Sequence, residues 1–175
     1  MKRSDGQFER RKNDFYSTWD PRAVAALLPH LPPQTRFCEP CAGDGALLDQ
    51  LTAAGHVCAR ARDIAPGRND IEQKDALTTI TGNIDCFITN PPWTRAILHP
   101  LIVHLSDQAP TWLLFDADWK HTKQAAPFLP RLRKIVSVGR LKWIQGSKCD
   151  GKDNCAWYLF DRPGNALPEF IGRAA

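Results

Sequence analysis

The sequence predicts an α/β fold, in which a mostly parallel β-sheet carries helices on both faces and ends in an antiparallel hairpin. Three observations support this prediction. Short apolar runs typical of buried strands alternate with amphipathic helical patterns, which is the order of elements in a parallel sheet. Turns that contain glycines or paired prolines directly follow several of these runs. The last two predicted strands are joined by a loop alone, which is too short for a parallel crossover, so they should pair antiparallel.

The first half of the chain supplies a helix, a strand, a second helix and a second strand. Asp20-Pro21 opens the first helix because proline is favoured in a first turn, and Pro32-Pro33 stops it. Apolar residues recur at helical spacing between these two points. The elements that follow are a strand at residues 35–38, a helix that starts at Ala46 and ends at Gly55, and a strand at residues 56–61.

The second half continues the alternation and ends in the hairpin. Its predicted elements are a strand at residues 84–89, a helix at 95–105, a strand at 111–115, a helix at 123–132 interrupted near Pro127 and Pro130, and hairpin strands at 134–144 and 155–160. The tail from Arg162 should be a loop. No internal repeat is present, so one domain is expected.

The length of 175 residues suits a single domain with one sizeable core. We expect a flexible basic arm at residues 1–13, the domain at residues 14–161 and a tail at residues 162–175. No run of 18 or more apolar residues is present, which predicts no membrane span, and the N-terminus lacks the apolar stretch of a signal peptide. A cytoplasmic protein is therefore expected.

The charge and the cysteine content indicate which partners and which metal sites can be expected. The net charge of +4 is mildly basic, which permits a nucleic-acid partner without requiring one. Cys38 and Cys41 have a CxxC spacing, but a structural zinc site usually needs two such pairs, and Cys149 and Cys155 have five residues between them. We therefore predict neither a metal site nor a disulfide framework.

A glycine-containing turn with two acids follows the first predicted strand. It reads Glu39-Pro40-Cys41-Ala42-Gly43-Asp44-Gly45. In an open α/β sheet, ligands bind at the carboxyl ends of strands, and glycines let the backbone approach them. The carboxylates of Glu39 and Asp44 would repel a bare phosphate. A ligand with an ammonium and a sulfonium group suits this turn better than a nucleotide pyrophosphate does.

Two further acids follow the next strands. Asp63 ends the second predicted strand, where it could accept hydrogen bonds from a ribose diol. Asp75 precedes Ala76 before the next strand and could bind the exocyclic amine of an adenine. Each acid alone is more simply explained as a loop carboxylate. Their occurrence together with the glycine turn favours a ligand site.

The stretch Asn90-Pro91-Pro92-Trp93 directly follows the strand at residues 84–89. A rigid turn would explain it, because two prolines fix two φ angles. The same rigidity could hold the Asn90 side-chain carbonyl and the Pro91 main-chain carbonyl as paired acceptors for an –NH2 group. Trp93 could then offer a flat face on which a base stacks. The stretch alone does not choose between these two interpretations.

These motifs together resemble the class I S-adenosylmethionine-dependent methyltransferases, of the type that methylates adenine N6 in DNA. The resemblance covers residues 14–160. It is carried by NPPW at residues 90–93, FCEPCAGDGALL at 37–48, the acids Asp63 and Asp75, the segment DFYST at 14–18, and two runs, at 142–143 and 153–157, that resemble the last hairpin of small phage adenine methyltransferases. It implies a Rossmann-like fold with a seven-stranded sheet.

The resemblance also implies roles for individual residues. The cofactor S-adenosyl-L-methionine would be held by Tyr16, Thr18, Glu39, Pro40, Gly43, Asp44, Gly45, Asp63, Asp75 and Ala76. Catalysis would fall to Asn90, Pro91, Pro92 and Trp93. The target base, flipped from a duplex or already single-stranded, would stack on Trp93 while Asn90 and Pro91 hold its amine. The expected partner is therefore double- or single-stranded DNA.

In one respect the sequence differs from this family's pattern, because we expect no separate target-recognition domain after the last hairpin. The candidates for contact with the nucleic-acid backbone are the N-terminal arm, the Lys120-His121 region and the loop at residues 145–152, which could also be a solvated hairpin tip. The lysines concerned are Lys120, Lys142, Lys148 and Lys152. Such contacts hold phosphate without reading sequence, so we expect a short or relaxed sequence preference, or a homodimer that supplies the missing surface.

Three alternatives use the same motif. Enzymes that methylate adenine in RNA or the amide of a protein glutamine also grip an –NH2 group, so NPPW does not distinguish among these substrates. A pseudoenzyme that binds the cofactor without catalysis is the third alternative. The intact residues 90–93 argue against it.

Overall fold

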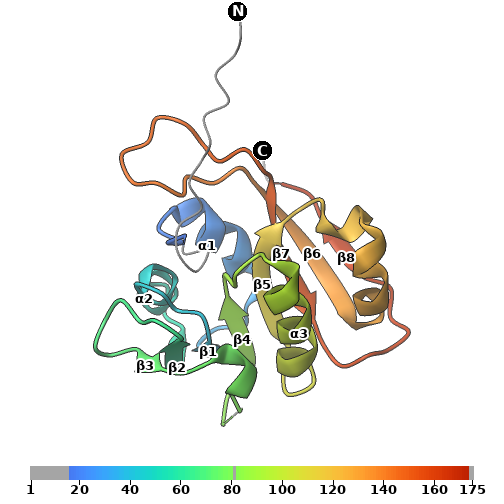
Figure 1. Ribbon diagram of the computed structural model, residues 1–175, viewed down its shortest axis with the longest axis horizontal. Coiled ribbons are helices and arrows are strands. Elements are labelled where there is room, and N and C mark those ends of the chain that lie inside the picture. Colours follow the sequence, from blue (N-terminus) through green and yellow to red (C-terminus); the bar gives the residue numbers. More distant parts are fainter. Residues whose placement is uncertain (1–15, 81, 174–175) are drawn as a thin grey trace, which may run out of the picture.

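The computed structural model describes residues 16–80 and 82–173, and its centre is one β-sheet (Figure 1). The strand order is β3-β2-β1-β4-β5-β7-β6-β8. The strands are β1 (Arg36–Glu39), β2 (Val57–Asp63), β3 (Glu72–Gln73), β4 (Cys86–Thr89), β5 (Thr111–Asp116), β6 (Leu132–Gly139), β7 (Cys155–Phe160) and β8 (Glu169–Ile171). The predicted arm at residues 1–13 lies outside the described residues.

The sheet is mostly parallel, as predicted. Strands β3, β2, β1, β4 and β5 run parallel to one another. Strand β7 is antiparallel to both β5 and β6, which confirms the predicted hairpin. The described residues form eight strands where seven were expected, because β8 pairs parallel with β6 at the edge of the sheet. The expectation that the whole tail from Arg162 is a loop is therefore wrong.

Helices cover both faces of the sheet. They are α1 (Pro21–Leu27), which continues into the 3₁₀ turn η2 (Leu28–His30), α2 (Ala46–Ala53), η3 (Ala76–Thr78), α3 (Arg95–Ser106), η4 (Trp119–His121) and η5 (Lys123–Arg131). Helices α1 and α2 share one buried cluster with strand residues such as Phe37 and Ile88. Helix α3 shares the other with their neighbours Cys38 and Phe87. This alternation follows the two-residue period of a strand.

Two predicted elements differ from the structure. Residues 123–131 form a 3₁₀ run, not an α-helix, because Pro127 and Pro130 lack the N–H groups that an α-helix needs. Strand β6 ends at Gly139, not at residue 144, and Gly139 has a φ of 88°. This left-handed conformation is easy for glycine and turns the chain out of the sheet. None of the described helices is long and apolar enough to cross a membrane.

The carboxyl ends of the parallel strands meet at one edge of the sheet. The strands β1, β2 and β4 deliver Glu39, Asp63 and Asn90 to this edge. The segment before α1 also lies there, because Asn90 donates a hydrogen bond to the main-chain oxygen of Tyr16. The fold thus gathers the predicted motifs from four separate parts of the chain.

Candidate active site

A pocket of about 520 Å³ lies where these segments meet. Nine of the ten predicted cofactor residues line it, namely Tyr16, Thr18, Glu39, Pro40, Gly43, Asp44, Asp63, Asp75 and Ala76. Of the four predicted catalytic residues, Asn90 and Pro92 line it, whereas Pro91 and Trp93 do not. The remaining lining residues are Ser17, Cys41, Ala42, Leu47, Ile64, Ala65, Leu77, Ile97 and Leu101.

The glycine turn is held in a left-handed conformation. Gly43 has a φ of 55° and Gly45 has a φ of 82°, which other residues rarely adopt. The Gly43 carbonyl accepts a hydrogen bond of 2.8 Å from the Gly67 amide. A Cβ atom on Gly45 would lie 2.5 Å from Nη1 of Arg68. Gly45, the one predicted cofactor residue outside the pocket lining, therefore shapes the turn and starts α2.

Asp63 both orders this turn and faces the pocket. Its Oδ2 atom accepts the Gly43 amide at 2.8 Å, and its Oδ1 atom accepts the Ala65 amide at 2.8 Å. A carboxylate has about four acceptor positions, so two stay available for a ligand. Asp75 is exposed and caps η3 by accepting the Leu77 amide at 2.9 Å. Both acids thus accept hydrogen bonds from loop main-chain amides, as expected of loop carboxylates. Both also line the pocket.

Glu39 is a buried acid with one oxygen that lacks a partner in the part of the chain that the structure describes. It is 1% exposed, and among the described residues no hydrogen-bond donor contacts its Oε2 atom. Burial raises the pKa of Glu39 well above its usual value, and the charges of Asp44 and Asp63 raise it further. Leaving a buried polar group unpaired costs free energy. A cationic ligand in this pocket would remove that cost by pairing with the carboxylate.

The Asn90 side chain has a defined orientation at the end of β4. Its Nδ2 atom donates to the Tyr16 carbonyl at 3.2 Å and to Oγ1 of Thr18 at 2.9 Å. Its Oδ1 atom accepts the indole N–H of Trp93 at 3.1 Å. An amide oxygen has two lone pairs, so one acceptor position on Oδ1 stays open.

Three aromatic rings form a cluster, and two of the residues concerned, Tyr16 and Trp93, hydrogen-bond with Asn90. Trp93 meets Trp143 edge to face, with ring centroids 5.7 Å apart, and Tyr16 lies 6.2 Å from Trp143. Both tryptophans are half-buried. From the sequence, Trp143 was predicted only as part of a hairpin run, with no place at the site. The signal available in the sequence was that Trp143 directly follows a basic residue, Lys142, close to the edge of the sheet.

Sequence reasoning also missed Ser17 and the apolar wall of the pocket. The Ser17 hydroxyl is buried and has no hydrogen-bond partner among the described residues. Ile97 and Leu101 lie four residues apart, so they share one face of α3 and line the same side of the pocket. The helical spacing of these two residues was visible in the sequence, but their nearness to the glycine turn was not.

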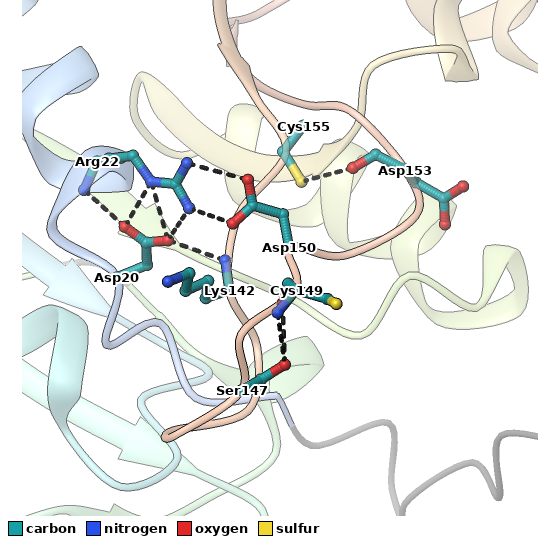
Figure 2. Close-up of polar contacts among 8 residues, drawn as sticks. All are labelled: Asp20, Arg22, Lys142, Ser147, Cys149, Asp150, Asp153 and Cys155. Carbon is teal, nitrogen blue, oxygen red and sulfur yellow. Dashed lines mark hydrogen bonds and ion pairs between the residues drawn. The ribbon is translucent and has the colours of Figure 1, made fainter.

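The predicted nucleic-acid lysines do not form one cluster. Lys142 and Lys148 line a second, polar pocket of about 640 Å³ together with Asp20, Arg22 and Asp150. Figure 2 shows Arg22 between the two aspartates, with Nη2 at 2.6 Å from Asp20 and 2.8 Å from Asp150. This contact ties the loop after β6 to the start of α1.

The other two lysines lie elsewhere. Lys120 is on η4, where its Nζ atom donates to the Ala117 carbonyl at 2.6 Å. Lys152 is exposed on the loop before β7. Neither of them lines the pocket of Lys142 and Lys148.

Both CxxC cysteines are free thiols, of which Cys38 is buried and Cys41 is half-buried. Burial raises the pKa of Cys38 to about 12, and burial also raises the pKa of Cys41. Within residues 16–80 and 82–173, no group of three or more His, Cys, Asp or Glu side chains is placed to hold a metal ion.

Comparisons with known proteins identify the fold. No protein-family model matches the chain, and no curated protein sequence does. Similar solved structures include a type I restriction-modification methyltransferase subunit from Streptococcus thermophilus, with a TM-score of 0.57 and 11% identity. They also include a dimethyladenosine transferase from Plasmodium falciparum, with a TM-score of 0.54 and 14% identity. A 23S rRNA methyltransferase, ErmE, has a TM-score of 0.55 and 15% identity.

These matches cover most of the present chain but different shares of its neighbours. The chain is covered to 90%, 83% and 88%, respectively. It spans 47% of the restriction-modification subunit, 62% of the dimethyladenosine transferase and 71% of the 23S rRNA methyltransferase. At such low identities the likeness establishes the fold alone. The chain has the Rossmann-like fold of class I methyltransferases.

Proposed function

We propose that this protein transfers a methyl group from S-adenosyl-L-methionine to the exocyclic N6 amine of adenine in DNA, with a short or relaxed sequence preference. One observation carries the proposal. A single pocket joins Glu39, a buried acid with one oxygen that lacks a partner among the described residues, to Asn90, whose side-chain carbonyl has a fixed orientation. The first suits a cationic ligand, and the second suits an amine.

The residues present fit S-adenosyl-L-methionine. The unpaired Glu39 oxygen suits a ligand with an ammonium and a sulfonium group. The glycine turn is left-handed at Gly43, which lines the pocket, and a glycine lets the backbone approach a ligand closely. Asp63 has acceptor positions left for a ribose diol, and exposed Asp75 can accept from an adenine amine. We assign the methionine end to Glu39, Tyr16 and Asp44.

The protein would act mainly by positioning. S-adenosyl-L-methionine, when bound, supplies a methyl group attached to a sulfonium. Asn90 Oδ1 and the main-chain oxygen of Pro91 would accept the two hydrogens of the target amine, which turns its lone pair toward the pocket. The half-buried ring of Trp93 would contact the base. No strong base is needed, because the amine can lose its proton after methylation, and correct placement supplies much of the rate.

Nucleic acid is the favoured substrate class for two reasons. Structural neighbours include a 23S rRNA methyltransferase and a restriction-modification methyltransferase subunit. Lys142 and Lys148 lie on the loop that also carries Trp143, which contacts Trp93. RNA adenine is the second candidate, because the same grip serves either nucleic acid. A protein glutamine amide or a non-catalytic cofactor-binding role has less support.

The experiment is methyl transfer from labelled S-adenosyl-L-methionine to unmethylated DNA, RNA and protein, offered separately. We expect label in DNA, and mass spectrometry of the digested nucleosides should show N6-methyladenine. Label in RNA alone, or N4-methylcytosine in DNA, would replace the substrate that we propose. Absence of transfer to all three, with cofactor binding intact, would favour the pseudoenzyme.

A further inference from the structure

The amide of Asn90 is oriented by two oxygen atoms of the segment before α1. Its Nδ2 atom donates to the Tyr16 carbonyl at 3.2 Å and to the Thr18 hydroxyl at 2.9 Å. A main-chain carbonyl accepts hydrogen bonds and donates none. If the amide were turned over, Asn90 Oδ1 would face that carbonyl oxygen and be repelled. Only one of the two amide orientations is therefore favourable.

Thr18 is itself fixed from the side of the cofactor turn. It is 6% exposed, and its main-chain oxygen accepts Nε2 of Gln50 at 2.7 Å. The same Gln50 nitrogen donates to the Ala46 carbonyl at 3.0 Å, within α2. Helix α2 begins directly after Gly45. A continuous chain of hydrogen bonds thus runs from the helix behind the glycine turn, through Thr18, to Asn90.

We propose that Thr18 is a positioning residue for Asn90, anchored by Gln50, and that its main contribution is to the rate of transfer, not to cofactor affinity. This inference rests on the proposed function, in which Asn90 Oδ1 accepts the target amine. It revises the expectation that Thr18 serves to hold the cofactor. It also explains why residue 90 is asparagine here, because an ionised aspartate has no hydrogen to donate to the Tyr16 carbonyl.

Thr18→Val tests the first part, because it removes the hydroxyl and keeps the shape. We expect kcat to fall about tenfold, the loss of one hydrogen bond to a neutral group. The Kd for the cofactor and the KM for the nucleic acid should change less than about twofold, because the proposed role of Thr18 is in the rate of transfer and not in binding. Thr18→Ser should restore most of kcat. Thr52→Val, on the exposed side of α2, is the matched control. A weakened cofactor Kd with unchanged kcat would overturn the inference.

Asn90→Asp tests the second part through pH. The introduced carboxyl must be protonated to donate to the Tyr16 carbonyl, so its activity relative to wild type should fall as pH rises. An Asn90→Asp enzyme with the wild-type pH profile would overturn the claim that the site requires a donor.

A measurement that does not depend on enzymatic activity separates this inference from the proposed function. In the free protein, the side-chain amide of Asn90 can be assigned by NMR from its loss in Asn90→Ala. We expect Thr18→Val to shift this resonance and speed its hydrogen exchange, and Thr52→Val to leave it unchanged. An unperturbed Asn90 amide in Thr18→Val would overturn the contact itself. If wild-type protein transferred no methyl group, the proposed function would fail while this result still stood.

Discussion

At the scale of single residues, Glu39 is an acid that stability alone would not favour at its position. A carboxyl that is 1% exposed, with an oxygen that no described donor contacts, lowers the stability of the free protein when it ionises. Such a residue persists where a ligand later supplies the missing partner. Ionisation of this side chain should therefore affect both the stability of the protein and its affinity for the cofactor, and both effects can be measured as a function of pH.

Glu39→Gln should stabilise the free protein increasingly as pH rises. Burial raises the folded-state pKa of Glu39, so its contribution to stability is fully present below the unfolded pKa and is lost as pH rises through the folded pKa. Glutamine keeps the shape but cannot ionise. Urea unfolding of both proteins across the pH range should show a growing difference in unfolding free energy. A difference that does not change with pH would contradict the burial argument.

The same acid should make cofactor binding release a proton. Because the pKa of free Glu39 is raised, the side chain is more fully protonated in the free protein than a normal glutamate, and a cationic ligand favours its ionised form. The affinity for S-adenosyl-L-methionine should therefore rise with pH. Calorimetry in buffers of different ionisation enthalpy measures the released proton. Glu39→Gln should bind more weakly and release no proton at this site, and an unchanged proton release would exclude Glu39 as its source.

At the scale of elements, Asp20 joins the start of α1 to the loop after β6. Its Oδ1 atom caps the helix by accepting the Arg22 amide at 3.1 Å, and its Oδ2 atom accepts the Lys142 amide at 2.8 Å. Trp143 follows directly and contacts Trp93. The position of the aromatic cluster beside Asn90 therefore depends on an acid outside the main pocket.

Asp20→Ala should lower the unfolding free energy by about 2 to 3 kcal/mol, because it removes a helix cap and a charged hydrogen bond. Burial opposes ionisation of Asp20, but the hydrogen bonds from Arg22 and Lys142 outweigh it and lower its pKa. Its contribution is thus present above the unfolded pKa and is lost as pH falls through the folded pKa. Denaturant unfolding at neutral and acid pH measures both effects.

Asp150→Ala is the matched control for Asp20→Ala. It removes the other carboxylate that pairs with Arg22, but the Asp150 side chain is 36% exposed and that of Asp20 is 5% exposed. Exposed ion pairs contribute little. If Asp150→Ala lowered the unfolding free energy as much as Asp20→Ala does, the pairing of Arg22, and not the buried helix cap, would hold α1 against the loop after β6.

Elements with a clear hydrophobic pattern were predictable from the sequence, and those set by distant contacts were not. Residues 84–89 and 111–115 are mainly apolar and contain β4 and most of β5, which are buried almost along their whole length. The residues of strand β8 are exposed or half-buried, so the sequence shows no hydrophobic pattern there. This strand forms because it pairs with β6. The residues of the glycine turn were predictable from local chemistry. Ser17, Trp143 and the bond from Trp93 to Asn90 depend on packing between separate segments.

At the scale of the whole molecule, the carboxyl edge of the sheet combines the proposed cofactor pocket with a neighbouring polar pocket. The segment at residues 16–22 lines both, since Tyr16 and Thr18 face the first and Trp19 and Arg22 face the second. A nucleic acid with a base at Asn90 would thus have its backbone close to Lys142 and Lys148. Electrostatic contacts of this kind are recognised by their dependence on salt.

Replacing both Lys142 and Lys148 by alanine should weaken nucleic-acid binding and flatten its salt dependence. Each lost phosphate contact reduces the slope of log K against log salt by about 0.7 for a single strand and about 0.9 for a duplex. Fluorescence anisotropy with labelled oligonucleotides measures both quantities. Arg36→Ala, at the amino end of β1 on the opposite edge of the sheet, is the control and should leave the slope unchanged. An unchanged slope in the double variant would exclude these lysines as phosphate contacts.

The central claim is that one pocket holds the cofactor while Asn90, at its edge, holds the amine. It is tested most directly by comparing wild type and Asn90→Ala for two quantities, cofactor Kd by calorimetry and labelled methyl transfer to DNA. We predict that Asn90→Ala binds S-adenosyl-L-methionine within a few-fold of wild type and transfers no methyl group above background. Transfer at the wild-type rate by Asn90→Ala, or no cofactor binding by wild type, would contradict the account.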